Sequence, residues 1–215
     1  MARYRGTMRV LLASTSPARR ALLRQAGIEP LTMAPEVDED AVIHAVEAAE
    51  GRTLPPDEHV LLLARRKALD VVARLALEDA DFDGLVIGGD SMFELDGLVL
   101  GKPHEPAIAT ERWHAMRGRT GILHSGHSVY RVIPGRTPVE AHAVAHASVT
   151  FVEDVTDAEI EAYVTDKEEK RKMRARADAY IRAHGAAPND GPSLCVLGRD
   201  EIAKQSRIGA LLRAR

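Results

Sequence analysis

The sequence lacks three features that would place it quickly in a class of proteins. It has a single cysteine among 215 residues, which excludes an internal disulfide and suits a reducing compartment, so a cytoplasmic location is expected. It has no apolar stretch near the roughly 20 residues that a membrane helix needs, and the apolar run near its start is too short for a signal peptide. It has no excess of positive charge either: the formal net charge is −3, which argues against a nucleic-acid polymer as partner.

The composition that remains is that of a globular protein, with 45% hydrophobic and 28% charged residues. The chain is long enough for one large domain, or for one domain with a small lobe. Apolar runs predict strands over 8–13, 28–33, 85–90, 92–95, 98–100, 128–133 and 143–152. Periodicity and caps predict helices over 17–26, from residue 55, over 110–117 and from residue 156. This alternation predicts an α/β fold, a mixed twisted sheet with helices on its faces.

The most informative segment is the junction between the first strand and the first helix. Ser16 can cap the helix, Pro17 suits its first position, and Leu22, Leu23 and Ala26 would face inward before Gly27 ends it. Free N–H groups at a helix start favour an anion. The hydroxyls of Ser14 and Ser16 and the guanidinium of Arg19 are candidate binding groups that suit a phosphate. An ordinary helix cap with solvated arginines is the alternative.

A second candidate group ends the strand over 85–90. Gly88 and Gly89 allow a ligand to approach the backbone, and Asp90 follows them. Open α/β sheets bind their ligands at such carboxyl ends of strands. Asp90 could orient or deprotonate an attacking water, or it could simply cap the next turn.

Three further charged residues fit the same chemistry. Glu39 lies in the acidic stretch 36–40, Lys67 projects from the helix that begins near residue 55, and Lys102 follows Gly101. Carboxylates suit Mg²⁺ or Mn²⁺, and cations neutralise a phosphoanhydride before water attacks it. Taken singly, each of these side chains could instead be a solvated surface group.

The histidines of the second half of the chain and the single cysteine are expected to have structural rather than functional roles. His124 and His127 have ligand-like spacing but no nearby cysteine or acidic partner, so loop histidines are expected. His142 and His146 lie four apart in a predicted strand, which places them on one face. Cys195 has no nearby base and is expected to be buried.

Taken together, the ordered motifs resemble those of the Maf family of nucleoside triphosphate pyrophosphatases. The matching segments are 12–19, 37–39, 64–68, 86–91, 96–97 with 101–103, and 118–120 followed by 125–126. Each segment is a weak signal alone, but the ordered set is specific and covers about residues 8 to 160. The resemblance implies one Maf-like domain over residues 1–215, with two lobes around a cleft, and a homodimer.

The resemblance also implies metal-dependent hydrolysis of a nucleoside triphosphate to the monophosphate and pyrophosphate. Asp90 would be the proton acceptor for the attacking water, and Glu39 and Asp90 would hold a Mg²⁺ or Mn²⁺ ion. Lys67 and Lys102 would be catalytic residues that hold the phosphates. The implied substrate-binding residues are Ser14, Ser16, Arg19 and Ser91.

The sequence departs from the family pattern after about residue 165. The segment 177–185 matches poorly a region where relatives carry an Ala-Gly-aromatic motif, and 189–193 only loosely resembles the later loop. A nucleotide-binding regulatory protein with little turnover is therefore an alternative to the enzyme. A hydrolase acting on another phosphoanhydride, such as a nucleotide sugar, is a third.

Overall fold

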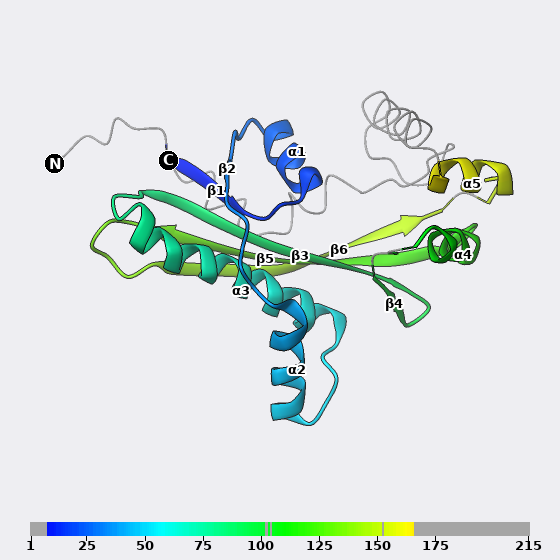
Figure 1. Cartoon of the computed structure of the whole chain (residues 1–215), viewed down its shortest axis with the longest axis horizontal. Coiled ribbons are helices and arrows are strands. Elements are labelled where there is room, and N and C mark those ends of the chain that lie inside the picture. Colours follow the sequence, from blue (N-terminus) through cyan, green and yellow to red (C-terminus); the bar gives the residue numbers. More distant parts are fainter. Residues whose placement is uncertain (1–7, 102, 104, 152, 166–215) are drawn as a thin grey trace. The chain divides into compact units, whose positions relative to one another are not determined.

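The computed structural model describes residues 8–101, 103, 105–151 and 153–165 (Figure 1). Its elements in chain order are β1 (Arg9–Ala13), α1 (Pro17–Gln25), β2 (Leu31–Thr32), α2 (Glu39–Glu50), α3 (Pro56–Glu78), β3 (Gly84–Leu95), β4 (Leu98–Leu100), α4 (Pro106–Met116), β5 (Thr120–Val132), β6 (Val139–Thr150) and α5 (Asp157–Thr165). Among these described elements, no helix is both long and apolar enough to cross a membrane.

The strands form one mixed sheet, as predicted. The order of its main path is β2-β1-β3-β5-β6, and β4 pairs with β3 off this path. β1 is parallel to both β2 and β3, whereas β4 is antiparallel to β3. The β3–β4 turn is a hairpin at Asp96-Gly97, in which both residues have positive φ, at 50° and 79°. The mixed α/β fold class is therefore confirmed.

The main core lies between α3 and the strands β1, β3 and β5. Its buried side chains are Leu11, Ala13, Ala68, Val71, Val72, Leu75, Phe82, Val86 and Tyr130. Because side chains alternate across a strand, the odd-numbered residues of β1 and the even-numbered residues of β3 and β5 face α3. Figure 1 shows α1 and α3 on opposite sides of these strands.

Two glycines let the backbone of α3 lie directly on the sheet. A Cβ on Gly88 of β3 would lie 2.2 Å from the carbonyl oxygen of Ala64. A Cβ on Gly126 of β5 would lie 2.2 Å from the carbonyl oxygen of Val60, one turn earlier in the helix. Only glycine fits such a backbone approach, so these two positions fix where α3 crosses the sheet.

The described chain divides into two compact units, which we describe separately. The first contains residues up to Ser91 together with Ser125–Ala145, and the second contains Met92–His124 and residues from His146 onward. In the second unit, the ring of Trp113 makes edge contacts with Phe151 and Tyr163, at centroid distances of 5.5 and 5.0 Å. These rings join α4, α5 and the residue after β6.

The first helix begins as predicted but does not bury the expected face. The Ser16 hydroxyl accepts the Arg19 N–H and Pro17 occupies the first turn. The inward orientation predicted for Leu22, Leu23 and Ala26 is wrong, because α1 has no buried residue and Leu22 is 46% exposed. The neighbouring β2 has only two residues, so there is little sheet for this helix to cover.

Two elements have other boundaries than predicted, and one helix was not predicted. The strand predicted over 28–33 is only β2, since Pro30 has no N–H to give to a ladder. Helix α2 was not predicted: Asp38 caps it by accepting the Ala41 N–H at 3.0 Å, and Gly51 ends it in the left-handed region. The helix predicted over 110–117 begins earlier, at Pro106.

The later strands are longer than predicted, which changes the interpretation of two histidines. β5 begins at Thr120, so the loop placement of His124 and His127 is wrong: both lie on this strand. His142 and His146 lie on β6, as predicted. The helix predicted from residue 156 is present, and it begins with a capping box in which the Glu159 carboxylate accepts the Thr156 N–H at 2.9 Å.

Candidate active site

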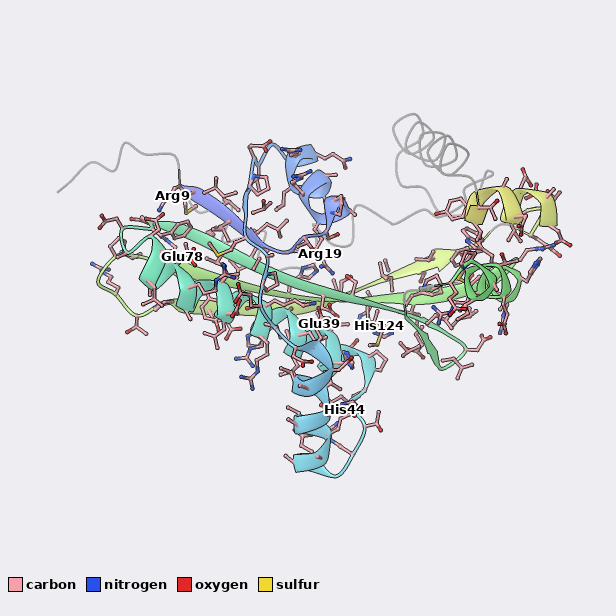
Figure 2. All side chains as sticks on the ribbon, viewed as in Figure 1. Arg9, Arg19, Glu39, His44, Glu78 and His124 are labelled. Atoms are coloured by element: carbon pink, nitrogen blue, oxygen red, sulfur yellow. The ribbon has the colours of Figure 1, made fainter. Side chains whose placement is uncertain are left out.

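The loop after β1 is built around the hydroxyls of two serines. Ser16 accepts the Arg19 backbone N–H at 3.4 Å and so starts α1. Ser14 is buried, and its Oγ accepts the Ser16 N–H at 3.1 Å and the Nη1 of Arg19 at 3.3 Å. The loop therefore fixes the Arg19 side chain through its own residues, beneath α1 on the sheet side (Figure 2).

Arg19 connects this loop to the middle of the sheet. Its Nη2 donates to the Ser91 hydroxyl at 3.2 Å, and that hydroxyl lies 3.2 Å from the Ser125 hydroxyl of β5. A Cβ on Gly89 would lie 3.2 Å from the Nε of Arg19, so a side chain there would press against the guanidinium. The glycine thus lets the arginine lie flat over β3.

The second group of charges centres on Lys67 of α3. Its Nζ lies 2.8 Å from Oε1 of Glu39 and 2.7 Å from Oδ1 of Asp90. The Lys67 and Asp90 side chains are only 9% and 14% exposed, whereas that of Glu39 is 50% exposed. A buried ammonium therefore joins a buried carboxylate to one that reaches solvent.

The two groups come together because β1 ends before β3 does. The last β1–β3 pair is Ala13 with Gly88, and β3 continues through Asp90 and Ser91. Successive strand residues point to opposite faces, so Asp90 meets α3 while Ser91 meets Arg19. The end of the parallel strand β1 is thus where groups from both faces of the sheet can act on one ligand.

The electrostatics of the site support this picture. Burial lowers the pKa of Arg19, while the negative charges of Asp90 and Glu39 act in the opposite direction and raise it. The described charges of the site are two cations, Arg19 and Lys67, and two carboxylates, Glu39 and Asp90. Because these charges balance, the described groups alone would not neutralise a polyphosphate.

The structure thus gathers most of the predicted site residues in the first compact unit. They are Ser14, Ser16, Arg19, Glu39, Lys67, Asp90 and Ser91. The expectation that Lys67 could be a solvated surface group is wrong, because its ammonium is buried. Lys102 and Cys195 lie outside the described residues, as do the divergent segments 177–185 and 189–193.

Sequence reasoning assigned no site role to two residues of β5 that lie beside this group: Ser125 belonged only to a matching segment, and His127 was expected in a loop. The Ser125 hydroxyl lies 3.2 Å from that of Ser91. Burial lowers the pKa of His127, and the positive charge of Arg19 lowers it further. Ser125 precedes Gly126 and His127 follows it, so both side chains lie on the same face of the strand. The sequence signal was that Ser125 and His127 are two residues apart, which places them on one face of a strand. The prediction of a loop around His127 left this relation unused.

Comparison with known proteins identifies the family. A family model described as "Maf-like protein" matches residues 9–187. A protein of Leifsonia xyli named "Nucleoside triphosphate pyrophosphatase" is 55% identical over 75% of this chain and 73% of its own length. Proteins of the same name from Mycobacterium sp. (strain JLS) and Streptomyces coelicolor are 49% and 46% identical, over 64% and 74% of this chain and 64% and 69% of their own lengths.

A crystal structure named as a dITP/XTP pyrophosphatase of Mycobacterium abscessus aligns with 83% of this chain and all of its own, at 15% identity. Its TM-score of 0.33 is too low to carry an argument. The family model over residues 9–187 and the relatives are decisive by themselves. This chain belongs to the Maf-like protein family.

Proposed function

We propose that this protein hydrolyses nucleoside triphosphates at the α–β phosphoanhydride, releasing pyrophosphate and the monophosphate. The observation that carries the proposal is the convergence of Arg19, Lys67, Glu39 and Asp90 at the end of β1. The names of the family relatives support the same reaction. They do not favour the alternative of a nucleotide-binding regulator with little turnover.

The phosphates would be held on the α1 side of the sheet. The Arg19 guanidinium offers several donors in a planar fork, and the hydroxyls of Ser14 and Ser91 already hold two of them. Ser16 would contribute mainly by shaping the loop, since its hydroxyl accepts the Arg19 N–H. We retain Lys102 as a further phosphate ligand on the family resemblance.

Asp90 would act on the attacking water. Its Oδ1 is bound to Lys67, so the ammonium fixes the orientation of the carboxylate and leaves Oδ2 to accept a hydrogen bond from water. Lys67 would in addition offset negative charge that develops on the phosphate in the transition state. Both roles depend on the buried position of the Lys67–Asp90 pair.

The same residues fit a divalent cation. Glu39 and Asp90 supply hard carboxylate oxygens, and Lys67 engages one oxygen of each, so each carboxylate has a second oxygen to offer. The balanced charge of the described site supports the need for such an ion, because a triphosphate brings about four negative charges. When bound, Mg²⁺ or Mn²⁺ would neutralise phosphate charge and orient the anhydride.

The test is pyrophosphate release from a panel of common and modified nucleoside triphosphates, with Mg²⁺ or Mn²⁺ and with a chelator. We expect release to stop in the chelator and to fall at least about 1,000-fold in Asp90→Asn, which keeps the shape but loses the charge. Asp81→Asn, an exposed carboxylate in the turn before β3, is the matched control and should retain wild-type activity. Full activity in Asp90→Asn would contradict the proposed role.

Three broader features also remain proposals. We propose a single Maf-like domain over 1–215, a homodimer and a cytoplasmic location, the first two from the family resemblance and the last from the single cysteine. Light scattering at micromolar concentration tests the dimer, because a monomer mass would contradict it. The nucleotide panel also separates a triphosphate substrate from a nucleotide sugar.

A further inference from the structure

His127 lies on the face of the sheet that carries the phosphate-binding groups. It alternates with Gly126, whose α3-facing side meets Val60, so the His127 side chain is on the opposite face with Ser125. On that face a Cβ on Gly89 would lie 3.6 Å from the Gly126 carbonyl oxygen and 3.2 Å from the Nε of Arg19. His127 is thus next to the strip of β3 over which Arg19 passes.

The imidazole has a polar atom whose bonding capacity is unused. Its Nε2 is buried, and among the residues that the structure describes it has no hydrogen-bond partner. Buried polar atoms of this kind are rare in folded proteins because they have given up hydrogen bonds to water without replacement, and each calls for an explanation such as a bound water, an ion or a catalytic role. Burial, and secondarily the charge of Arg19, lowers the pKa of His127 and favours the neutral ring.

We propose that His127 is a substrate-contacting residue whose Nε2–H donates a hydrogen bond to a phosphate oxygen held by Arg19. The inference rests on the proposed function, since it supplies the anion that the imidazole meets. A neutral imidazole is suited to this place because it adds a donor without adding a second cation against the guanidinium. The negative charges of Asp90 and Glu39 are balanced by the positive charges of Lys67 and Arg19. The phosphate would therefore meet the charged guanidinium of Arg19 and the neutral N–H donor of His127.

The test is direct binding, measured by titration calorimetry with Mg²⁺. One probe is inorganic tripolyphosphate, and the other is the α,β-methylene analogue of the best substrate from the panel. His127→Phe keeps a flat ring but has no donor, and it should raise the dissociation constant about 10-fold for both probes, the loss of one hydrogen bond to a charged group. His127→Gln places an amide N–H near the same position and should stay within about 3-fold of wild type.

The same exchanges at His44 are the matched control. His44 is exposed on α2, away from the loop after β1 (Figure 2), and His44→Phe and His44→Gln should leave both affinities unchanged. Unchanged binding in His127→Phe would overturn the inference, as would equal loss in the Phe and Gln variants, which would indicate shape alone. Loss for the analogue but not for tripolyphosphate would assign the contact to the nucleoside and overturn the phosphate role.

A measurement on the unmutated protein keeps the inference testable if the variants fold poorly. Long-range ¹H–¹⁵N spectra of the histidine rings, assigned by through-bond and through-space experiments on the labelled wild-type protein, should show the His127 Nε2 signal shift on addition of tripolyphosphate. No shift of this signal under saturating probe would overturn the inference. If wild-type protein binds neither probe, the proposed function itself fails, which the wild-type titration alone reveals.

Discussion

At the scale of single residues, burial gives Lys67 its importance. An isolated lysine on a helix is ordinarily solvated, yet the Lys67 side chain is 9% exposed and its ammonium lies within 2.8 Å of two carboxylate oxygens. A charge so buried is tolerated only when it is paired. Removing it would leave Asp90 close to Glu39 with no cation between them.

We therefore expect Lys67→Gln to lower kcat/KM for pyrophosphate release at least about 100-fold, equivalent to about 2.7 kcal/mol of transition-state stabilisation. Two effects contribute: the carboxylate of Asp90 loses its fixed orientation, and the phosphate loses a cation. Arg66→Gln is the matched control, because Arg66 is the next residue on α3 but is exposed. Steady-state kinetics measures kcat/KM for both variants. Values for Lys67→Gln and Arg66→Gln that differ by less than about 3-fold would contradict this role for Lys67.

At the scale of elements, the distance between α3 and the sheet positions the catalytic pair. Lys67 is on α3 and Asp90 is on β3, so their 2.7 Å contact depends on how closely these elements pack. That packing is set by Gly88 under Ala64 and Gly126 under Val60. The glycines are therefore structural requirements of the site, although neither needs a positive φ.

We expect Gly88→Ala to destabilise the fold by about 3 kcal/mol, since the new Cβ would meet helix backbone that cannot rotate away. Urea unfolding measures the loss. Gly101→Ala is the control, because a Cβ there meets nothing within 4 Å, and its free energy of unfolding should stay within about 0.5 kcal/mol of wild type. A Gly88→Ala protein as stable as the control would show that α3 can shift, against the packing described here.

At the scale of the whole molecule, three strands contribute residues to both compact units. β3, β5 and β6 each have residues in both units, so neither unit can unfold completely without disrupting strands of the other. The single tryptophan, Trp113, lies in the second unit, whereas Arg19, Lys67 and Asp90 lie in the first. The chain therefore carries a natural reporter outside the unit that holds these three residues.

We expect one cooperative unfolding transition. Trp113 fluorescence and far-UV circular dichroism should give the same urea midpoint. Saturating tripolyphosphate with Mg²⁺ should raise both midpoints together, because a ligand that binds only the folded state stabilises whatever unfolds with its site. A fluorescence midpoint that ignores the ligand while the dichroism midpoint moves would show that the units unfold independently.

Local rules were sufficient where a feature depends on neighbouring residues. The Ser16 cap, the Pro17 helix start, the Asp96-Gly97 hairpin and the Thr156–Glu159 capping box all follow from chain separations of a few residues. The ordered motifs also indicated the family, and the match of the Maf-like family model to residues 9–187 agrees with them. For α2, the local signals at Asp38 and Gly51 were present but were masked by the acidic composition of the stretch.

The sequence by itself determined the mixed α/β class, the order of the elements apart from α2, and the residue types available for polyphosphate chemistry, because these depend on local backbone preferences and periodicity. Only the tertiary structure decided that Lys67 is buried between Glu39 and Asp90, and that His127 lies beside Arg19. These contacts join segments that are distant in the chain. Their geometry depends on strand register and on the approach of α3, which only packing of the whole sheet establishes.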